Sequence, residues 1–233
     1  MKATKIIFLL VLPMMFLSAC VSSDTANSDT VKQSEIYQSY SVSYDAGDVE
    51  LSATAYFRFG GSGGTTLLLS KPSNITFDGL EMSMGKSMFT GSYYETHLQN
   101  TFRGTYVFKF TDTEKKTYTN TAAINAIEVG EYADEGSKKK GFSIGFNDKA
   151  IANGEKVTLT IEDGNHNTRT ITSDLVGTTS VEVKPADLKD FVTGDANIYF
   201  TREMNSSLTE ATHLGGSMDI SYISKKKGIK IIE

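Results

Sequence analysis

The chain has very few of the residues that cross-link a fold or carry common cofactors. Its 233 residues include one cysteine, three histidines and no tryptophan. A single cysteine excludes an intrachain disulfide, so the folded part must be stabilised by its own apolar core. The histidines are isolated in the sequence. The absence of tryptophan argues against a carbohydrate-binding surface of flat aromatic rings, although tyrosine can take the place of tryptophan there. We therefore expect no cofactor and no catalytic residue.

After the first twenty residues, no run of apolar residues has the 3.6-residue period of an amphipathic helix. Basic residues do not outnumber acidic ones either. The chain carries 23 basic and 28 acidic residues, a net charge of −5. This acidity argues against nucleic acid as a partner and against electrostatic adhesion to anionic lipid. About 200 residues can still bury enough apolar surface for one or two domains.

The N-terminus is the most informative segment. Lys2 and Lys5 precede an apolar run from Ile6 to Leu17, which is long enough for a signal sequence but too short to cross a bilayer. The run ends in Leu17-Ser18-Ala19-Cys20, and Cys20 is the only cysteine of the chain. The alternative is an ordinary secreted protein with an incidental cysteine near its cleavage site.

This Leu-Ser-Ala-Cys motif resembles the lipobox of bacterial lipoproteins. The resemblance implies that residues 1–19 are removed and that Cys20 becomes an acylated first residue, carrying diacylglycerol and an N-linked chain such as palmitate. Two or three acyl chains hold a protein firmly to a membrane. Val21 in place of the enteric retention aspartate favours the cell outer membrane, without indicating the leaflet.

A polar segment with no periodic apolar pattern, residues 20–33, follows the signal and is predicted to be a flexible tether. Cleavage would remove Lys2 and Lys5, which lowers the 23 basic residues to 21 against 28 acidic ones, a net charge of −7. The mature protein is therefore expected to be an acidic, membrane-anchored protein of a bacterial cell envelope.

Beyond the tether, apolar residues recur at every second position in short runs, which is typical of half-buried strands. About seven strands are predicted between residues 34 and 122, including 40–44, 51–59, 65–69, 74–77, 93–98, 106–110 and 117–123. A second set is predicted within 123–233, including 142–146, 157–161, 168–172, 181–183, 197–200 and 218–222. Pro185 to Leu188 predicts a single helical turn. The pattern favours an all-β fold of two tandem modules, 34–122 and 123–233.

Two segments support this fold class. Val181 to Glu203 resembles the connection between strands E and F of bacterial immunoglobulin-like or fibronectin-III-like domains, and Gly104 to Thr121 resembles the last hairpin of such a module. The resemblance implies two immunoglobulin-like antiparallel β-sandwiches and export, and it carries over no functional residue.

One motif has the spacing of a catalytic site. Gly60 to Gly64 satisfies G-x-S-x-G, the turn that exposes a nucleophilic serine, here Ser62, between a strand and a helix. Strand patterns lie on both sides of this turn, so a hairpin loop is the better interpretation. A serine hydrolase using Ser62 remains an alternative.

A second motif has the spacing of a calcium loop. Asp163, Asn165, Asn167 and Asp174 occupy its first, third, fifth and twelfth positions. The sixth position is Thr168 where the sharp turn needs glycine, and Asp163-Gly164 fits a hairpin turn. We expect no metal site, and the alternative is a calcium ion bound by these four oxygen donors.

Methionine and aromatic residues gather between residues 82 and 94. Phe89, Tyr93 and Tyr94 are the candidate binding residues, because adaptable and aromatic side chains can form a recognition surface. The alternative is that they fill the core of the first module.

The chain also contains two short lysine runs, 138–140 and 225–227. We interpret both as turns exposed to solvent, where charge discourages pairing between sheet edges. The alternative is that they contact phosphate groups of the envelope.

These observations favour a non-catalytic binding or adhesion module, because antiparallel sandwiches hold variable loops at their ends. The partners would be the membrane, through Cys20, and an extracellular or envelope protein or glycan. The alternative is a structural spacer or assembly component of an envelope complex. A binding module should show an exposed apolar or aromatic patch, whereas a spacer should be evenly polar.

Overall fold

The computed structural model describes residues 25–147 and 149–233, and it confirms the predicted all-β fold of packed sheets. The predicted signal peptide and Cys20 lie outside the described residues. The only helical elements described are three 3-10 turns: η1 (Ser28–Thr30), η2 (Gln33–Glu35) and η3 (Pro185–Leu188). η3 is the single turn predicted from the sequence. None of these turns has the length and apolarity of a membrane-crossing helix.

Alternating side chains produce the strands, as β2 (Ile36–Asp45) and β3 (Glu50–Phe59) show. In both strands every second residue is buried, so one row of side chains faces the core and the other faces outward. The remaining strands up to residue 123 are β1 (Thr25–Asn27), β4 (Thr65–Leu68), β5 (Asn74–Phe77), β6 (Leu80–Glu81), β7 (Ser83–Ser87), β8 (Gly91–Gln99), β9 (Thr105–Thr111) and β10 (Thr117–Ala123). After residue 123 come β11 (Glu135–Ser137), β12 (Phe142–Gly145), β13 (Glu155–Asp163), β14 (Thr168–Ser173), β15 (Ser180–Val183), β16 (Gly194–Ser207), β17 (Gly216–Ile223) and β18 (Lys227–Ile232).

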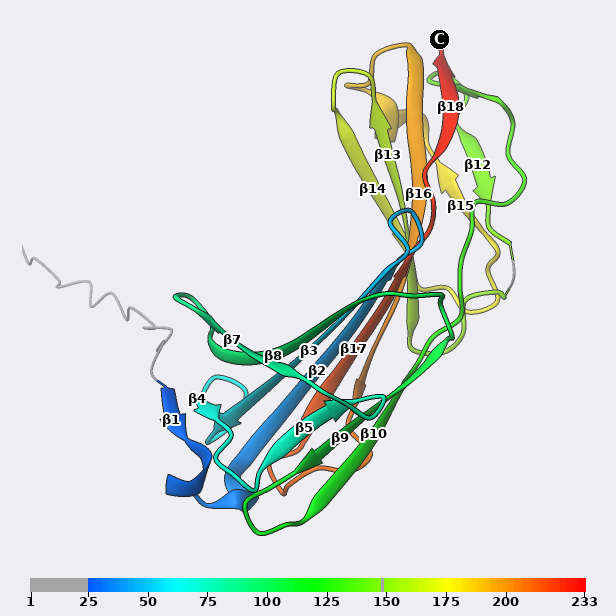
Figure 1. Cartoon of the computed structure of the whole chain (residues 1–233). Coiled ribbons are helices and arrows are strands. Elements are labelled where there is room, and N and C mark those ends of the chain that lie inside the picture. Colours follow the sequence, from blue (N-terminus) through cyan, green and yellow to red (C-terminus); the bar gives the residue numbers. More distant parts are fainter. Residues whose placement is uncertain (1–24, 148) are drawn as a thin grey trace, which may run out of the picture.

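The first sandwich packs two sheets face to face (Figure 1). Its larger sheet has the order β4-β3-β2-β17, and β8 and β7 also pair onto this sheet through β3. The facing sheet has the order β10-β9-β5-β6. Aromatic rings fill the space between them: the rings of Tyr40 and Phe108 stack at 4.6 Å, and those of Phe57 and Phe110 lie 4.4 Å apart. Such ring pairs stabilise a core beyond the area that they bury.

The second sandwich packs β14-β13-β16-β18-β11 against the two-stranded sheet of β12 and β15. Phe146 and Phe200 meet edge to face at 5.4 Å between the two layers. Ile144 and Val183, from the two-stranded sheet, are fully buried on the same core. This smaller layer covers only part of the larger sheet (Figure 1).

One continuous sheet runs through both sandwiches, which differs from the prediction of two consecutive modules. β17 comes from the range assigned to the second module, yet it pairs in parallel with β2 of the first, from Gly216↔Gln38 to Ile223↔Asp45. β16 joins the two parts, because its residues 194–198 pair with β18 and its residues 201–207 pair with β17. The first sandwich therefore takes a central strand from the C-terminal part of the chain.

The passage from one part of the sheet to the other is a β-bulge. Residues 224–226, between β17 and β18, lie opposite only Tyr199 and Phe200 of β16. The Ser224 hydroxyl accepts the Phe200 N–H at 2.9 Å, and the Ser224 N–H donates to the Phe200 carbonyl at 2.8 Å. A bulge bends its strand and increases the local twist. It lets one edge of β16 carry two strands that belong to different sandwiches.

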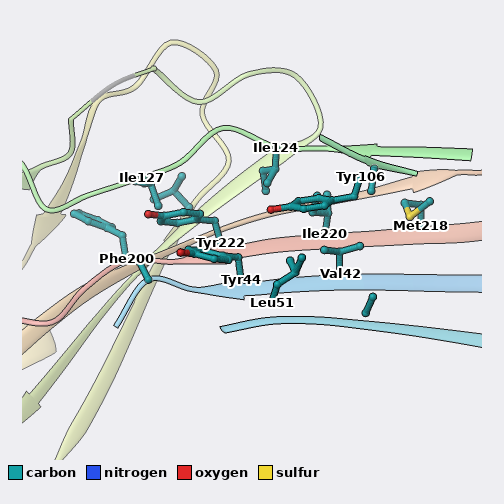
Figure 2. Close-up of a cluster of buried hydrophobic side chains, with 14 of the residues drawn as sticks. Val42, Tyr44, Leu51, Tyr106, Ile124, Ile127, Phe200, Met218, Ile220 and Tyr222 are labelled. Atoms are coloured by element: carbon teal, nitrogen blue, oxygen red, sulfur yellow. The ribbon is translucent and has the colours of Figure 1, made fainter. Parts of the chain in front are cut away.

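The hydrophobic core is also continuous across the junction (Figure 2). Tyr222 of β17 stacks on Tyr44 of β2 at 5.4 Å and meets the ring of Phe102 at 4.7 Å. Figure 2 shows Ile127 and Phe200 next to this group on the side of the second sandwich. The two sandwiches are therefore joined by buried side chains as well as by backbone pairing.

The predicted tether is wrong for its described part, residues 25–33. β1 pairs in parallel with β4, from Thr25↔Thr66 to Asn27↔Leu68. The side chain of Gln33 is buried and its Nε2 donates to the Ser28 carbonyl at 2.6 Å, while the Ser28 hydroxyl accepts the Ser70 N–H at 2.8 Å. These hydrogen bonds explain how a polar segment without an apolar period can pack onto the first sandwich.

Candidate functional site

The candidate site lies on the outer side of the continuous sheet, where the strands carry small polar residues. In β2, Ser39, Ser41 and Ser43 alternate with the buried Tyr40 and Val42, so the three hydroxyls point away from the core. β3 repeats this arrangement with outward Ser52 and Thr54. We call the outward side chains of β13, β16, β17, β2, β3 and β8 the polar face.

Strand register arranges the polar face in rows across the sheet. The first row consists of Lys156, Glu203, Ser221, Ser43, Ser52 and His97. The second row consists of Asn205, Asp219, Ser41, Thr54 and Glu95. The third row contains Ser207, Ser217, Ser39 and Tyr56. Neighbouring strands lie about 4.8 Å apart and neighbouring rows about 6.8 Å apart, so the polar face presents a regular grid of polar groups.

Side-chain hydrogen bonds hold these rows in place. The hydroxyls of Ser39 and Ser217 lie 3.0 Å apart, and the Ser221 hydroxyl donates to the Ser43 hydroxyl at 3.0 Å. The Asn205 amide donates to a carboxylate oxygen of Asp219 at 2.5 Å. Each serine pair retains lone pairs for a further hydrogen bond, and the second Asp219 oxygen is a further acceptor on the same row.

A groove of about 580 Å³ follows the first two rows. Its lining combines four hydroxyl side chains of β2 and β3 with Asp219, Asn205 and Glu203, and with Lys156 near the start of β13. Both sandwiches contribute, because β13 belongs to the second and β2 and β3 to the first. The volume lies in the range of pockets that hold small molecules.

Tyr56 and Tyr93 form an aromatic pair at one end of the third row. Their ring centroids are 5.8 Å apart, and the Arg58 guanidinium lies 5.4 Å from the Tyr56 ring centre. The Tyr93 ring also covers Gly85 across the hairpin, where a Cβ in place of the glycine hydrogen would lie 2.5 Å from the ring. A glycine at this position of β7 therefore allows the ring to lie flat on the strand.

His97 and two carboxylates end the first row. The His97 Nε2 lies 3.3 Å from Glu95, and its Nδ1 lies 3.2 Å from Glu50 and 3.0 Å from the Ser52 hydroxyl. The hydrogen bond to Glu95, followed by that to Glu50, raises the pKa of His97 above its ordinary value. This end of the polar face therefore gains positive charge at a higher pH than an isolated histidine would.

The three predicted binding residues do not come together. Tyr93 lies on the polar face beside Tyr56, whereas Tyr94 points to the opposite side of β8, is buried, and its hydroxyl accepts the Leu69 N–H at 2.8 Å. Burial raises the pKa of Tyr94. Phe89 lies in the turn between β7 and β8 and is exposed. Adjacent residues of a strand face opposite sides, so Tyr93 and Tyr94 could not share one surface.

Three of the four predicted calcium donors, Asp163, Asn165 and Asn167, lie in the hairpin turn between β13 and β14, as the Asp163-Gly164 pair indicated. The fourth, Asp174, is exposed in the loop after β14, away from this turn. The Asp163 carboxylate accepts the N–H groups of Asn165, Asn167 and Val192 and the Asn167 amide, all at 2.8–2.9 Å. Burial alone would raise the pKa of Asp163, but these hydrogen bonds outweigh it and hold the pKa below its ordinary value. No group of three or more histidine, cysteine or carboxylate side chains suitable for a metal occurs in the described ranges 25–147 and 149–233.

Ser62 lies on an exposed loop between β3 and β4, so a strand follows it where a nucleophile elbow requires a helix. The histidines have other partners. His97 contacts Glu95, Glu50 and Ser52, His166 contacts Glu162 at 2.9 Å, and His213 contacts the Ser34 carbonyl at 2.5 Å. Cys20 lies outside the described residues, so its modification stays a prediction.

Comparison with known proteins gives no family. No protein-family model matches the chain, and no curated protein sequence matches it. Among solved structures, similar chains include the SGBP-B protein of a Bacteroides ovatus mixed-linkage glucan utilization locus, in complex with a mixed-linkage heptasaccharide. It is 12% identical, with a TM-score of 0.25, over 78% of this chain and 53% of that one.

Two adhesins have similarly low sequence identities and TM-scores. A tetra-tandem repeat from the extending region of a large adhesion protein is 13% identical, with a TM-score of 0.27, over 84% of this chain and 49% of that one. A 1.5-MDa bacterial ice-binding adhesin is 14% identical, with a TM-score of 0.24, over 84% of this chain and 65% of that one. This chain spans about half to two thirds of these solved chains. At such TM-scores the overall arrangements differ, and no function is carried over.

Proposed function

We propose that this protein is a non-catalytic binding module of a bacterial cell envelope, anchored through acylated Cys20, and that it holds a glycan in the groove of the polar face. The observation that carries this proposal is the register of hydroxyl, amide and carboxylate groups over five strands of one sheet. A glycan presents hydroxyls at a regular spacing, and such a grid offers donors and acceptors to several of them at once.

Asp219 and Asn205 are the residues expected to contribute most to affinity. Their side chains are joined at 2.5 Å, so the carboxylate is oriented before any ligand arrives. An oriented carboxylate accepts hydrogen bonds from hydroxyls, and charge-assisted bonds are stronger than neutral ones. Preorganisation also reduces the entropy lost when a ligand binds.

The aromatic pair extends the groove. Tyr56 follows Thr54 on the outward side of β3, so the ring pair with Tyr93 lies one row away from the groove lining. Tyrosine combines an apolar ring face with a polar hydroxyl, which suits the face of a sugar ring. We expect the ligand to run from the groove toward Tyr56.

The test is binding of the full chain, reconstituted in vesicles, to an array of neutral and acidic oligosaccharides, followed by calorimetry with those retained. D219A and N205A should each weaken binding by about tenfold, which corresponds to about 1.4 kcal/mol. The matched control is D190A, which removes the same charge from an exposed residue of the second sandwich. Equal affinities for D219A and D190A would refute the groove as the site.

The structural-spacer alternative gives a different outcome in the same experiments. A spacer should retain no oligosaccharide, and D219A should then leave its association with envelope proteins unchanged. The anchor is tested separately, by mass spectrometry of the native chain and by membrane partitioning of C20A. An unmodified Cys20 would remove the anchor from the proposal without affecting the test of the groove.

A further inference from the structure

The turn between β7 and β8 holds two large apolar side chains away from the core. Met88 is 87% exposed and Phe89 is 81% exposed, and Met84 on β7 is also exposed. We call Met88 and Phe89 the hairpin tip. Isolated exposed apolar residues are common, but two adjacent ones at the end of a projecting hairpin form a small protruding apolar surface.

Local hydrogen bonds fix the backbone of this turn. The Ser87 hydroxyl accepts the N–H groups of Phe89 at 3.2 Å and Thr90 at 3.3 Å. Gly91 follows with a φ of +76°, and a Cβ there would lie 2.2 Å from the Thr66 hydroxyl. The turn is therefore pressed against β4 at its base, while its apolar side chains remain in solvent.

The hairpin tip lies beside the start of the described chain (Figure 1). Thr25 and Met88 line one shallow recess of about 280 Å³, together with Lys86, Ser87 and Gly91. The Thr25 hydroxyl is also 3.3 Å from that of Ser92, the second residue of β8. The first residue of β1 and the hairpin tip are thus fixed on the same side of the molecule.

Cys20 is five residues before Thr25 in the sequence. Even a fully extended chain spans at most about 3.6 Å per residue, so Cys20 cannot be more than about 18 Å from Thr25. An acylated Cys20 lies at a bilayer surface, and the tether expected to separate the body from the membrane is shorter than predicted because residues 25–33 belong to the fold. The hairpin tip is therefore held within reach of the bilayer.

We propose that Met88 and Phe89 insert into the bilayer interface next to the lipid anchor and so form a second membrane contact. This inference rests on the anchoring of Cys20 in the proposed function. Apolar side chains beside a lysine, here Lys86, suit the boundary between acyl chains and polar headgroups, where the long lysine side chain can reach the water. Two contacts fix the orientation of the body on the membrane, whereas a single anchor would leave it free to rotate.

The absence of tryptophan makes this directly measurable. F89W in the full chain, acylated on Cys20 and reconstituted in vesicles of phosphatidylcholine and phosphatidylglycerol, places one fluorophore at the hairpin tip. We expect its emission to shift to shorter wavelength and to be quenched by lipids brominated on their acyl chains. The matched control is L175W, an exposed apolar position in the loop after β14, which should show neither effect.

A second measurement removes the anchor. C20A in the mature chain, which begins at residue 20 and so lacks the apolar run Ile6 to Leu17, should retain weak binding to the same vesicles. M88S with F89S in that background should weaken this binding by at least tenfold, whereas L175S with V176S should not. Equal emission and equal quenching of F89W and L175W in acylated protein would overturn the inference while leaving the anchor intact. An unmodified Cys20 in the native protein would instead count against the anchor, which keeps the two failures distinguishable.

Discussion

The guanidinium of Arg202 on β16 donates to the carboxylate of Glu155 at 2.9 Å, and both side chains are buried at the junction of the two sandwiches. Arg202 is 0% exposed and also donates to the Lys149 carbonyl, while its guanidinium lies 5.8 Å from the Phe146 ring centre. The same Glu155 oxygen accepts the Ala152 N–H at 2.9 Å. This pair connects β13 and β16 at the point where the continuous sheet changes partners.

Loss of one member of this pair should destabilise the protein strongly. E155A leaves the Arg202 charge buried without its carboxylate, which typically costs about 3–5 kcal/mol. We expect urea denaturation to show this decrease in the free energy of unfolding, and R202M with E155L to recover most of it. K32A, in the exposed pair with Glu35 at 3.2 Å, is the control and should change the value by less than about 1 kcal/mol.

Asp163 should make stability depend on acid pH. Its folded pKa is below its ordinary value, because the hydrogen bonds from Asn165, Asn167 and Val192 outweigh the effect of burial. The stabilisation is therefore complete above the unfolded pKa of about 3.9 and is lost as the pH falls through the lower folded pKa.

D163N should remove this pH dependence. It should also lower the free energy of unfolding by about 2 kcal/mol at neutral pH, because an amide has only one oxygen and cannot accept the hydrogen bonds from all four donors. D174N, from the same predicted calcium set, should have little effect. Since both Asp163 oxygens are already used, Ca²⁺ should not raise the melting temperature, and a rise that D163N abolishes would contradict this assignment.

His97 should titrate above an ordinary histidine. Hydrogen bonds to Glu95 and Glu50 raise its pKa, so its contribution to stability is complete below about pH 6.5 and is lost as the pH rises through the folded value. E95Q should lower the pKa of His97, measured by NMR. E81Q, the same change at an exposed carboxylate of β6, is the matched control and should leave the pKa of His97 unchanged.

A fragment that ends at residue 122 should not fold by itself. Without β17, the β2 strand loses its parallel partner from Gln38 to Asp45 and becomes an exposed edge, and Tyr44 loses the ring of Tyr222. We expect no cooperative thermal transition by circular dichroism, whereas the full chain should show one. A cooperative transition in the fragment would support residues 34–122 as an independent module.

Local pattern is a good guide to individual strands. β5 and β10 have the predicted bounds, because their alternation is bounded by clear turn residues. β18 is not predicted, because its first residue belongs to the lysine run 225–227, whose charge fits a solvated turn. β7 is not predicted either, since Gly85 interrupts its pattern, and only the Tyr93 ring from the neighbouring strand fills that place.

The candidate site is predicted less well than the strands. The serines of β2 and the outward residues of β3 are visible in the sequence as an alternation of small hydroxyl and apolar side chains. Their partners are not, because Ser43 and Ser221 are 178 residues apart and meet only through the parallel pairing of β2 and β17. Tyr93 is among the predicted binding residues, but its ring neighbour Tyr56 is not.

The all-β class and the positions of most strands can be predicted from local pattern alone, because alternation with a period of two reflects one buried face of each strand and does not depend on which strands are its neighbours. The sequence also supplied the Leu-Ser-Ala-Cys motif on which the proposed anchor depends. The order of strands in the sheet, the junction between the sandwiches and the polar face become visible only once the chain is folded. Long-range pairing depends on how distant strands bury their apolar faces together, and short sequence patterns do not contain that information.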